Sequence, residues 1–235
     1  MFIKLVVISR KMSQEITRHF DEVAQRYDFY KRKNWYYYEA LKRLYAQLIP
    51  HAHETSILEV GCGTGDILAS LHPRHGVGID VSKEMVRMAR AKHKDLDVEV
   101  GAAESWKAKE QFDYIILSDV IEHLSDVNQT LKNLASLSTQ HTIIIITMAN
   151  PLWEPLLMLA EKAGMKMPEG PHTRLARKDI EALARQNGLK IVKRGKRLLI
   201  PKKIPLLHAI NDWFYKIPLI RKLGLIEYLV VKKET

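Results

Sequence analysis

Cysteine is almost absent from this 235-residue chain, which carries only Cys62. A single cysteine excludes an internal disulfide and is typical of a protein kept in the reducing cytosol. The sequence also lacks an apolar run of about 18 residues, the length that a membrane-spanning helix requires. Neither an internal repeat nor a low-complexity segment is present. These absences favour a cytoplasmic globular protein whose core fits one sizeable domain.

The opening stretch MFIKLVVIS is apolar but is interrupted by Lys4 and lacks the small-residue cleavage site of a signal peptide. Two interpretations remain open for it. It is either a short first strand or an upstream extension, with the true start at Met12. The helical pattern that begins with MSQEITRHF favours the second interpretation.

Charge is strongly unbalanced, with 37 lysines and arginines against 27 acidic residues and a net charge of +10. Such a balance suits nucleic acid, an anionic membrane surface or an acidic substrate, and it also serves solubility alone. The composition of 46% hydrophobic and 27% charged residues excludes wholesale disorder. Charge by itself therefore does not choose the partner.

Hydrophobic periodicity predicts helices within residues 13–49, followed by alternating strands and helices. Five strands are expected at 56–60, 76–80, 97–101, 112–118 and 141–147, and helices at 65–72, at 82–93 and from just after 118 to about 137. The run HTIIIIT has the continuous β-branched character of a strand buried on both faces. This alternation predicts an α/β fold, with a parallel sheet covered by helices on both sides.

The last third of the chain departs from the alternation. A loop at 165–174 precedes an expected helix at 177–187, and two final strands are expected at 188–200 and 226–233. The segment 201–224 between these strands is too long for a hairpin turn and is predicted to be an amphipathic insert. We therefore expect N-terminal lid helices at 1–50 and one continuous domain at 51–235.

The strongest motif is ILEVGCGTGDIL, in which a strand ends at a glycine-rich turn. Gly61, Gly63 and Gly65 allow the backbone to turn sharply and to approach a ligand closely. The dinucleotide-binding fingerprint requires a further glycine where Asp66 stands, and a carboxylate there disfavours a pyrophosphate. The expected ligand is therefore a nucleoside without phosphates, whose ribose hydroxyls would be held by Asp80 at the end of the next strand.

The runs LEVGCGTG and GVGIDVSKEMVRMAR, in this order, resemble the class I S-adenosylmethionine-dependent methyltransferases over about residues 13–150. This resemblance implies a doubly wound, Rossmann-like sheet of seven mostly parallel strands. It also implies that Glu59 and the loop 61–65 hold the methionine end of S-adenosylmethionine, and that Asp80 holds the ribose. Ala102 stands where the family often has an aspartate near the adenine, so the Ala103 backbone or Glu104 would make that contact.

The N-terminal run HFDEVAQRYDFY resembles the lid of the same family. Tyr27 would close over the cofactor or the substrate, or it would simply pack its ring in an amphipathic helix. In a helix, the aromatic run 35–38 places rings on all sides. One of these sides must contact something other than the domain core, which favours a substrate pocket beside it. Ser118, at the end of the fourth strand, would border the cofactor.

Asp119, Glu122 and His123 lie at helical spacing in LSDVIEHL. This run resembles both the ubiquinone-biosynthesis O-methyltransferases and the small-RNA 2′-O-methyltransferases, which implies a divalent cation such as Mg²⁺ or Mn²⁺ at the three residues. The stretch GPHTRLARKDIEAL resembles a second motif of the quinone-pathway enzymes and makes His172 a further candidate. Metal-free proton transfer by His123 or His172 is an alternative. In a third interpretation, Asp119 and Glu122 form a capping box at a helix start.

Three functions from different classes follow. The first is O-methylation of a hydrophobic, phenolic or lipid-like acceptor. The second is 2′-O-methylation of RNA, against which no RNA-binding motif is found. The third is a non-catalytic S-adenosylmethionine-binding protein. The insert 201–224, with an apolar face flanked by lysines, would rest on an anionic membrane or cover a lipophilic substrate, or would serve as a core helix or dimer contact.

Overall fold

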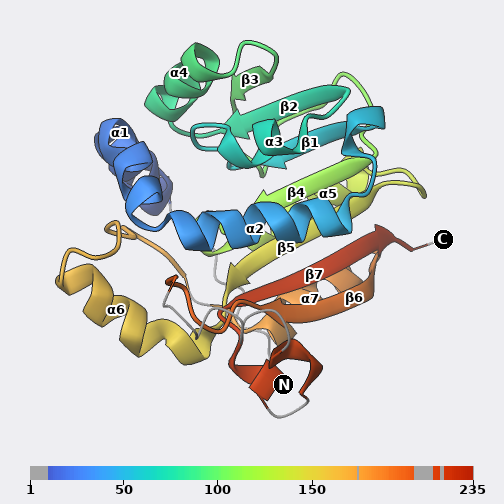
Figure 1. Cartoon of the computed structure of the whole chain (residues 1–235). Helices are drawn as coiled ribbons and strands as arrows, with labels where there is room; N and C mark the ends of the chain where they lie inside the picture. Colours follow the sequence, from blue (N-terminus) through green and yellow to red (C-terminus); the bar gives the residue numbers. More distant parts are fainter. Residues whose placement is uncertain (1–9, 174, 204–213, 218–219, 235) are drawn as a thin grey trace.

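The computed structural model describes residues 10–173, 175–203, 214–217 and 220–234 (Figure 1). Two helices come first, α1 (Arg10–Lys33) and α2 (Trp35–Leu48). The strands are β1 (Ser56–Val60), β2 (His75–Asp80), β3 (Asp97–Val100), β4 (Tyr114–Ser118), β5 (Ile143–Ala149), β6 (Leu189–Arg197) and β7 (Ile226–Lys233). The remaining α-helices are α3 (Asp66–Leu71), α4 (Lys83–Lys92), α5 (Val127–Leu137), α6 (Glu154–Lys162) and α7 (Arg177–Gln186).

The seven strands of the described residues form one sheet in the order β3-β2-β1-β4-β5-β7-β6. The first five in this order are parallel to one another, whereas β7 runs antiparallel to both β5 and β6. The predicted doubly wound, mostly parallel α/β sheet is confirmed. The strand order reverses between β1 and β4, and ligands of such sheets bind at the carboxyl ends of the strands beside that reversal.

Helices cover both faces of the sheet, with α2 and α3 on one face and α5 and α7 on the other (Figure 1). Successive residues of β4 and β5 point to opposite faces. Ile116 and Ile145 pack with α2, while Ile115 and Ile144 pack with α5 and α7. Both faces are thus apolar, which explains the uninterrupted isoleucine run of β5.

Of the two N-terminal helices, α2 packs on the sheet and α1 packs beside α4. α2 packs on the sheet through Leu41, Leu44 and Tyr45, which are buried in the same cluster as residues of β1, β4 and β5. α1 lies beside α4, where the Asp21 carboxylate accepts hydrogen bonds from the Ser82 hydroxyl at 2.6 Å and the Glu84 amide at 3.2 Å. The division into lid helices at 1–50 and a domain at 51–235 stays a prediction.

One predicted helix start is wrong. The helix after β4 begins at Val127, and Asp126 caps it by accepting a hydrogen bond from the Gln129 amide at 2.9 Å. Asp119 has a left-handed φ of 51°, and a single 3₁₀ turn follows at Ile121–His123. Asp119, Glu122 and His123 therefore do not share a helix face, and Asp119 and Glu122 form no capping box.

Helix α6 follows β5 and was not predicted. The two interpretations of MFIKLVVIS concern residues 1–9, which lie outside the described residues. So does the middle of the predicted insert, 204–213, whereas short 3₁₀ turns occupy Phe214–Lys216 and Ile220–Leu223. Within the described part of the chain, no helix combines the length and the hydropathy that crossing a bilayer requires.

Candidate cofactor and acceptor site

The glycine-rich turn after β1 is folded back against the end of β2. Gly61 and Cys62 donate their amide hydrogens to the Ile79 carbonyl at 2.8 and 3.0 Å. Gly61 has a φ of 70°, and a Cβ added there would lie 2.3 Å from a methyl carbon of Val120. Glycine is therefore required at 61 both by the backbone conformation and by the close approach of the segment after β4.

Two buried carboxylates at the strand ends face this turn. Asp80 accepts hydrogen bonds from the amides of Gly63 and Ser82, each at 2.9 Å, and Glu59 accepts one from the Leu68 amide at 3.1 Å. Burial raises the pKa of Asp80 above its ordinary value. Burial also raises the pKa of Glu59 to about 8, although Lys31 and the Leu68 amide oppose the shift. Both carboxylates lie where they can accept hydrogen bonds from a ligand bound at the glycine turn.

Helix α1 closes over the same turn. The Tyr27 ring lies over Gly63, where an added Cβ would be 3.4 Å from the ring, and the Lys31 ammonium lies 4.7 Å from the ring centre. Lys31 also donates to the Thr64 hydroxyl and the Asp66 carboxylate, both at 2.9 Å. Tyr27 thus lies over the glycine turn, and Lys31, which was not predicted from the sequence, ties α1 to that turn.

The segment after β3 lines the site with small side chains. Ala103 is buried against the cavity, and Ser118 borders it at the end of β4. Glu104 is occupied structurally, because its Oε1 accepts hydrogen bonds from the Ser125 hydroxyl and from the amides of Ser125 at 2.9 Å and Asp126 at 3.1 Å. The Ala103 carbonyl also accepts a hydrogen bond, from the Asn133 side-chain amide at 2.9 Å, so both groups predicted to contact the adenine have partners within the protein.

Asp119 is held by a hydrogen-bond network that sequence analysis did not find. Its carboxylate accepts from the Tyr37 hydroxyl at 2.5 Å and from the Thr147 hydroxyl at 2.9 Å. Thr147 in turn accepts from the Asp119 amide at 3.2 Å and pairs with the Tyr45 hydroxyl at 3.2 Å. Burial raises the pKa of Asp119, and the two hydroxyl donors oppose that rise. The only hint in the sequence was the aromatic run 35–38.

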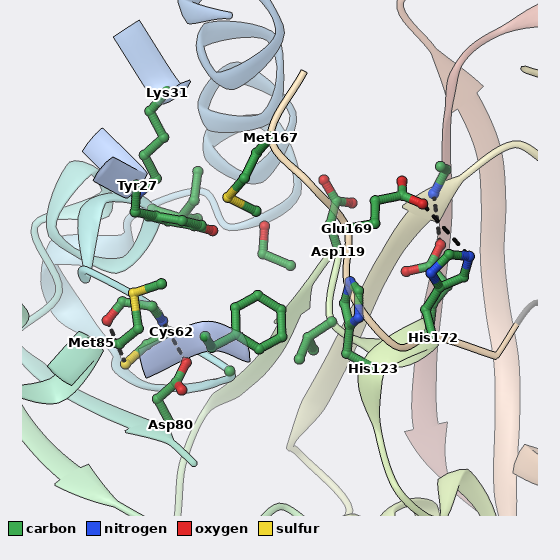
Figure 2. A pocket seen from close by; sticks show the side chains of 18 of the residues that line it. Tyr27, Lys31, Cys62, Asp80, Met85, Asp119, His123, Met167, Glu169 and His172 are labelled. Atoms are coloured by element: carbon green, nitrogen blue, oxygen red, sulfur yellow. Dashed lines mark hydrogen bonds and ion pairs between the residues drawn. The ribbon is translucent and has the colours of Figure 1, made fainter. Parts of the chain in front are cut away.

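His123 and His172 stand next to each other across the site from the glycine turn, with ring centres 6.1 Å apart (Figure 2). Nδ1 of His123 is 3.2 Å from the Pro171 carbonyl, and Nδ1 of His172 is 2.9 Å from the Gly170 carbonyl. Because a carbonyl only accepts, Nδ1 carries the proton in both rings, and Nε2 of each neutral ring keeps a lone pair.

The two imidazoles differ in their surroundings. Burial lowers the pKa of His123 to about 4, and the Phe20 ring packs edge-on against it at 5.1 Å. His172 instead has the Glu169 carboxylate 3.6 Å from its Nε2, and Glu169 also pairs with Lys166. The Glu169 carboxylate thus faces the ring nitrogen of His172 that is not turned toward the Gly170 carbonyl. Sequence analysis did not identify Glu169.

The expected cation site at Asp119, Glu122 and His123 does not fit this geometry. Asp119 binds Tyr37 and Thr147, Glu122 accepts from the Ala149 amide at 3.3 Å, and His123 turns toward Pro171. Among residues 10–173 and the other described ranges, the three side chains that do bring metal-ligand atoms together are the exposed His51, His53 and Glu54. They precede β1 and lie outside the cavity lining.

Both halves of the site open into one cavity of about 320 Å³. One part contains Tyr27, Lys31, Cys62 and Asp80, and the other contains Asp119, His123, Glu169 and His172 (Figure 2). Mostly apolar side chains complete the second part, among them Phe20, Leu41, Leu157, Ala160, Met165 and Met167. The cavity therefore has two parts. The polar part lies where the strand order reverses and suits a nucleoside, and beyond it lies an apolar chamber that contains the two imidazoles.

Comparison with known proteins identifies the class. A family model described as a methyltransferase domain matches residues 30–194, so the chain belongs to that family. Among curated relatives, the demethylmenaquinone methyltransferase of Chlorobaculum parvum is 30% identical over 136 residues, which cover 54% of this chain and 56% of the relative. The ubiquinone biosynthesis O-methyltransferase of Rhodopseudomonas palustris is 29% identical over 126 residues, 49% of each chain. The chain thus spans about half the length of the curated relatives it matches.

Solved structures agree on the fold. An S-adenosylmethionine-dependent methyltransferase from Thermotoga maritima superposes with a TM-score of 0.71 at 18% identity, covering 93% of this chain and all of the other. At this identity the match supports the architecture alone. The predicted resemblance to class I methyltransferases, and to their quinone-pathway branch, is confirmed at the level of family and fold.

Proposed function

We propose that this chain is an S-adenosylmethionine-dependent methyltransferase that methylates a hydroxyl group of a hydrophobic or phenolic small molecule. The observation that carries the proposal is the continuity of one cavity from the glycine turn and Asp80 to the imidazoles of His123 and His172. In-line methyl transfer requires the acceptor and the donor methyl group to be held in contact, and a shared cavity provides this.

In this proposal the cofactor lies along the carboxyl ends of β1 and β2. Asp80 accepts hydrogen bonds from the ribose hydroxyls, and Glu59 accepts them from the amino group of the methionine end. Gly61, Gly63 and Gly65 let the backbone approach the cofactor, and Tyr27 covers it. Ala103 and Ser118 border it, and the Glu104 side chain supports the adjoining loop from behind.

The acceptor occupies the apolar chamber beyond the methyl group. His172 accepts the hydroxyl proton at Nε2, and Glu169 stabilises the resulting imidazolium. His123, whose pKa is lowered to about 4, remains neutral at pH 7 and orients the acceptor. Asp119, held by hydrogen bonds from Tyr37 and Thr147, lines the cavity between the cofactor part and the acceptor chamber. Because Asp119, Glu122 and His123 do not converge, no step is assigned to a Mg²⁺ or Mn²⁺ ion.

Calorimetric titration with S-adenosylmethionine and S-adenosylhomocysteine tests the cofactor assignment. Asp80→Ala should weaken binding by about 10- to 100-fold, since a buried carboxylate that accepts hydrogen bonds contributes about 1.5–3 kcal/mol. Asp95→Ala, which removes an exposed carboxylate before β3, is the matched control and should bind like wild type. Unchanged affinity of Asp80→Ala would reject the ribose assignment, and a wild-type chain that binds neither compound would reject the cofactor itself.

The base is tested once screening of phenolic compounds yields an acceptor. His172→Gln should keep cofactor affinity and lower kcat by about 100-fold or more, because general-base catalysis contributes about 10²–10⁴. A kcat close to that of wild type would assign the proton transfer elsewhere.

The match to a methyltransferase domain supports an enzyme over the non-catalytic alternative. RNA methylation remains as an alternative with a distinct outcome. The apolar chamber lined by Phe20, Met165 and Met167 favours a small hydrophobic acceptor over a ribose. Salt-sensitive binding to oligonucleotides would favour RNA instead. The cytoplasmic location and a membrane contact through 201–224 stay predictions. Membrane contact is consistent with the exposed Lys202, Lys203 and Lys222 within that segment.

A further inference from the structure

Helix α6 presents its apolar side chains to the outside. Leu156, Met158 and Leu159 are 53%, 50% and 62% exposed, and Leu152 just before the helix is 66% exposed. The two acidic residues of the helix, Glu154 and Glu161, are half-buried instead, and Glu161 accepts a hydrogen bond from the Glu169 amide at 3.4 Å. A surface helix of a soluble domain normally has the opposite arrangement.

The inward side of α6 is also apolar, because it forms a wall of the cavity. Leu157 and Ala160 line the acceptor chamber, and Met165 lines it just beyond the helix. Figure 1 shows α6 extending from the end of β5, clear of the helices that cover the sheet. A single helix thus separates the acceptor chamber from the surroundings of the protein.

The exposed apolar area continues on both sides of α6. On one side, the Asn34 side chain donates a hydrogen bond to the carbonyl of Met165, just after α6, at 3.2 Å. The next residue, Trp35, therefore lies near the end of α6 and is 47% exposed. On the other side, the Trp153 indole donates to the carbonyl of the 48% exposed Leu223 at 2.6 Å. We call the area formed by Leu152, Leu156, Met158, Leu159, Trp35 and Leu223 the α6 surface.

Exposed cations border the α6 surface. Lys162 lies on its outward face, Lys33 donates to the Gly164 carbonyl at 2.6 Å, and Lys203 stands 6.0 Å from the Trp35 ring centre. Arg221 and Lys222 are exposed next to Leu223. A patch of leucines with a tryptophan at its margin and lysines around it matches the layers of an anionic bilayer: acyl chains, interface and phosphates.

From this arrangement we infer that the α6 surface docks on the surface of an anionic lipid bilayer. A second copy of the chain is a poorer occupant, because two cationic rims would be brought together on a chain of net charge +10. Docking would place the wall of the acceptor chamber against the lipid, so that a lipophilic acceptor reaches the chamber without crossing water. That last consequence rests on the proposed function, whereas docking itself does not.

Flotation of the full chain with vesicles tests the inference. Wild type should float with vesicles of phosphatidylcholine and phosphatidylglycerol, and at least tenfold less with phosphatidylcholine alone. Leu156→Glu/Leu159→Glu should lower the partition coefficient on the mixed vesicles at least tenfold. The matched control, Gln140→Glu/Val192→Glu, adds the same two charges at exposed positions on other elements and should float like wild type. Lys162→Glu/Lys203→Glu should reduce the dependence on phosphatidylglycerol.

Three outcomes would overturn the inference. Wild type that floats with neither vesicle type has no such surface. Equal losses in the α6 variant and the control variant would indicate a general charge effect. A dimer in light scattering that Leu156→Glu/Leu159→Glu converts to a monomer, with flotation unchanged, would make a second copy the occupant. Calorimetric binding of S-adenosylmethionine is measured on the same variants, so a failure of the cofactor assignment is detected separately from a failure of docking.

Discussion

The Tyr37 hydroxyl donates a hydrogen bond to the Asp119 carboxylate across 2.5 Å. The bond joins the first turn of α2 to the residue that leaves β4 with a left-handed φ of 51°. The Thr147 hydroxyl, from β5, donates to the other oxygen of the same carboxylate at 2.9 Å. Three elements are therefore fixed around one carboxylate at the centre of the cavity.

Removing the Tyr37 hydroxyl should destabilise the protein. In Tyr37→Phe the enclosed carboxylate of Asp119 loses a donor, which costs about 1–3 kcal/mol at pH 7 and moves the pKa of Asp119 further upward. Urea denaturation measures the loss. Tyr30→Phe, on α1, is the control, since no hydrogen bond of the Tyr30 hydroxyl is found within the described ranges. Equal stability of Tyr37→Phe and wild type would show that the bond contributes nothing.

Glu59 should make the ligand-free protein less stable as pH rises. Its pKa is about 8 in the folded state and 4.5 ordinarily, so between these values the folded chain holds a proton that the unfolded chain has released. The free energy of unfolding therefore falls from pH 4.5 to 8 and levels off above 8. At about 1.36 kcal/mol per pKa unit, the fall attributable to Glu59 is at most roughly 5 kcal/mol.

Glu59→Gln isolates this effect. The variant should match wild type near pH 4.5 and exceed it in stability above pH 8, as measured by urea denaturation over a pH series. Glu22→Gln, exposed on α1, should follow the wild-type curve throughout. Parallel curves for Glu59→Gln and wild type would mean that the folded state does not hold the Glu59 proton.

Gly61→Ala should be destabilising for two separable reasons. The added methyl group would lie 2.3 Å from Val120, and the φ of 70° is strained for alanine. We expect a loss of about 1–3 kcal/mol in thermal or urea denaturation. Gly61→Ala/Val120→Ala should recover, relative to Val120→Ala alone, the part of the loss that comes from the Val120 methyl groups, while the contact with the Val120 Cβ at 2.9 Å and the backbone part remain. No recovery would show that the clash is relieved elsewhere.

Lys31→Met should loosen α1 from the glycine turn. It removes the hydrogen bonds to Thr64 and Asp66, which should cost about 1–3 kcal/mol and speed protease cleavage within α1. Although burial alone would raise the pKa of Asp66, Lys31, Lys92 and His93 hold it well below 3.8. That stabilisation is present above pH 3.8 and is lost as pH falls, so the difference from wild type should shrink in acid. Arg32→Met, exposed on the same helix, is the control.

Much of the scaffold could be predicted from the sequence because its determinants are local. The isoleucine run of β5 needs apolar surroundings on both faces, and glycines 61, 63 and 65 adopt the positive φ values that glycine tolerates. The position of Asp80 followed from the length of one strand–helix–strand unit. These features depend on neighbours within about 20 residues along the chain.

The part of the cavity around the acceptor chamber could not be predicted in the same way. Asp119 is fixed by Tyr37 and Thr147, which are 82 and 28 residues away in sequence, and these contacts override the helical spacing of LSDVIEHL. Helix α6 escaped prediction because leucines and methionines occupy both its faces, so it lacks the polar stripe of an amphipathic helix. Glu169 acquires its role only through the loop that brings it beside His172.

The place of β7 in the sheet has a consequence for biosynthesis. β7 is the last strand in chain order, yet it lies between β5 and β6. While the chain is being synthesised, β6 has no partner in the sheet and β5 has an open edge until residues 226–233 leave the ribosome. During that interval the isoleucine-rich edge of β5, Ile143–Ala149, is open to pairing with other chains.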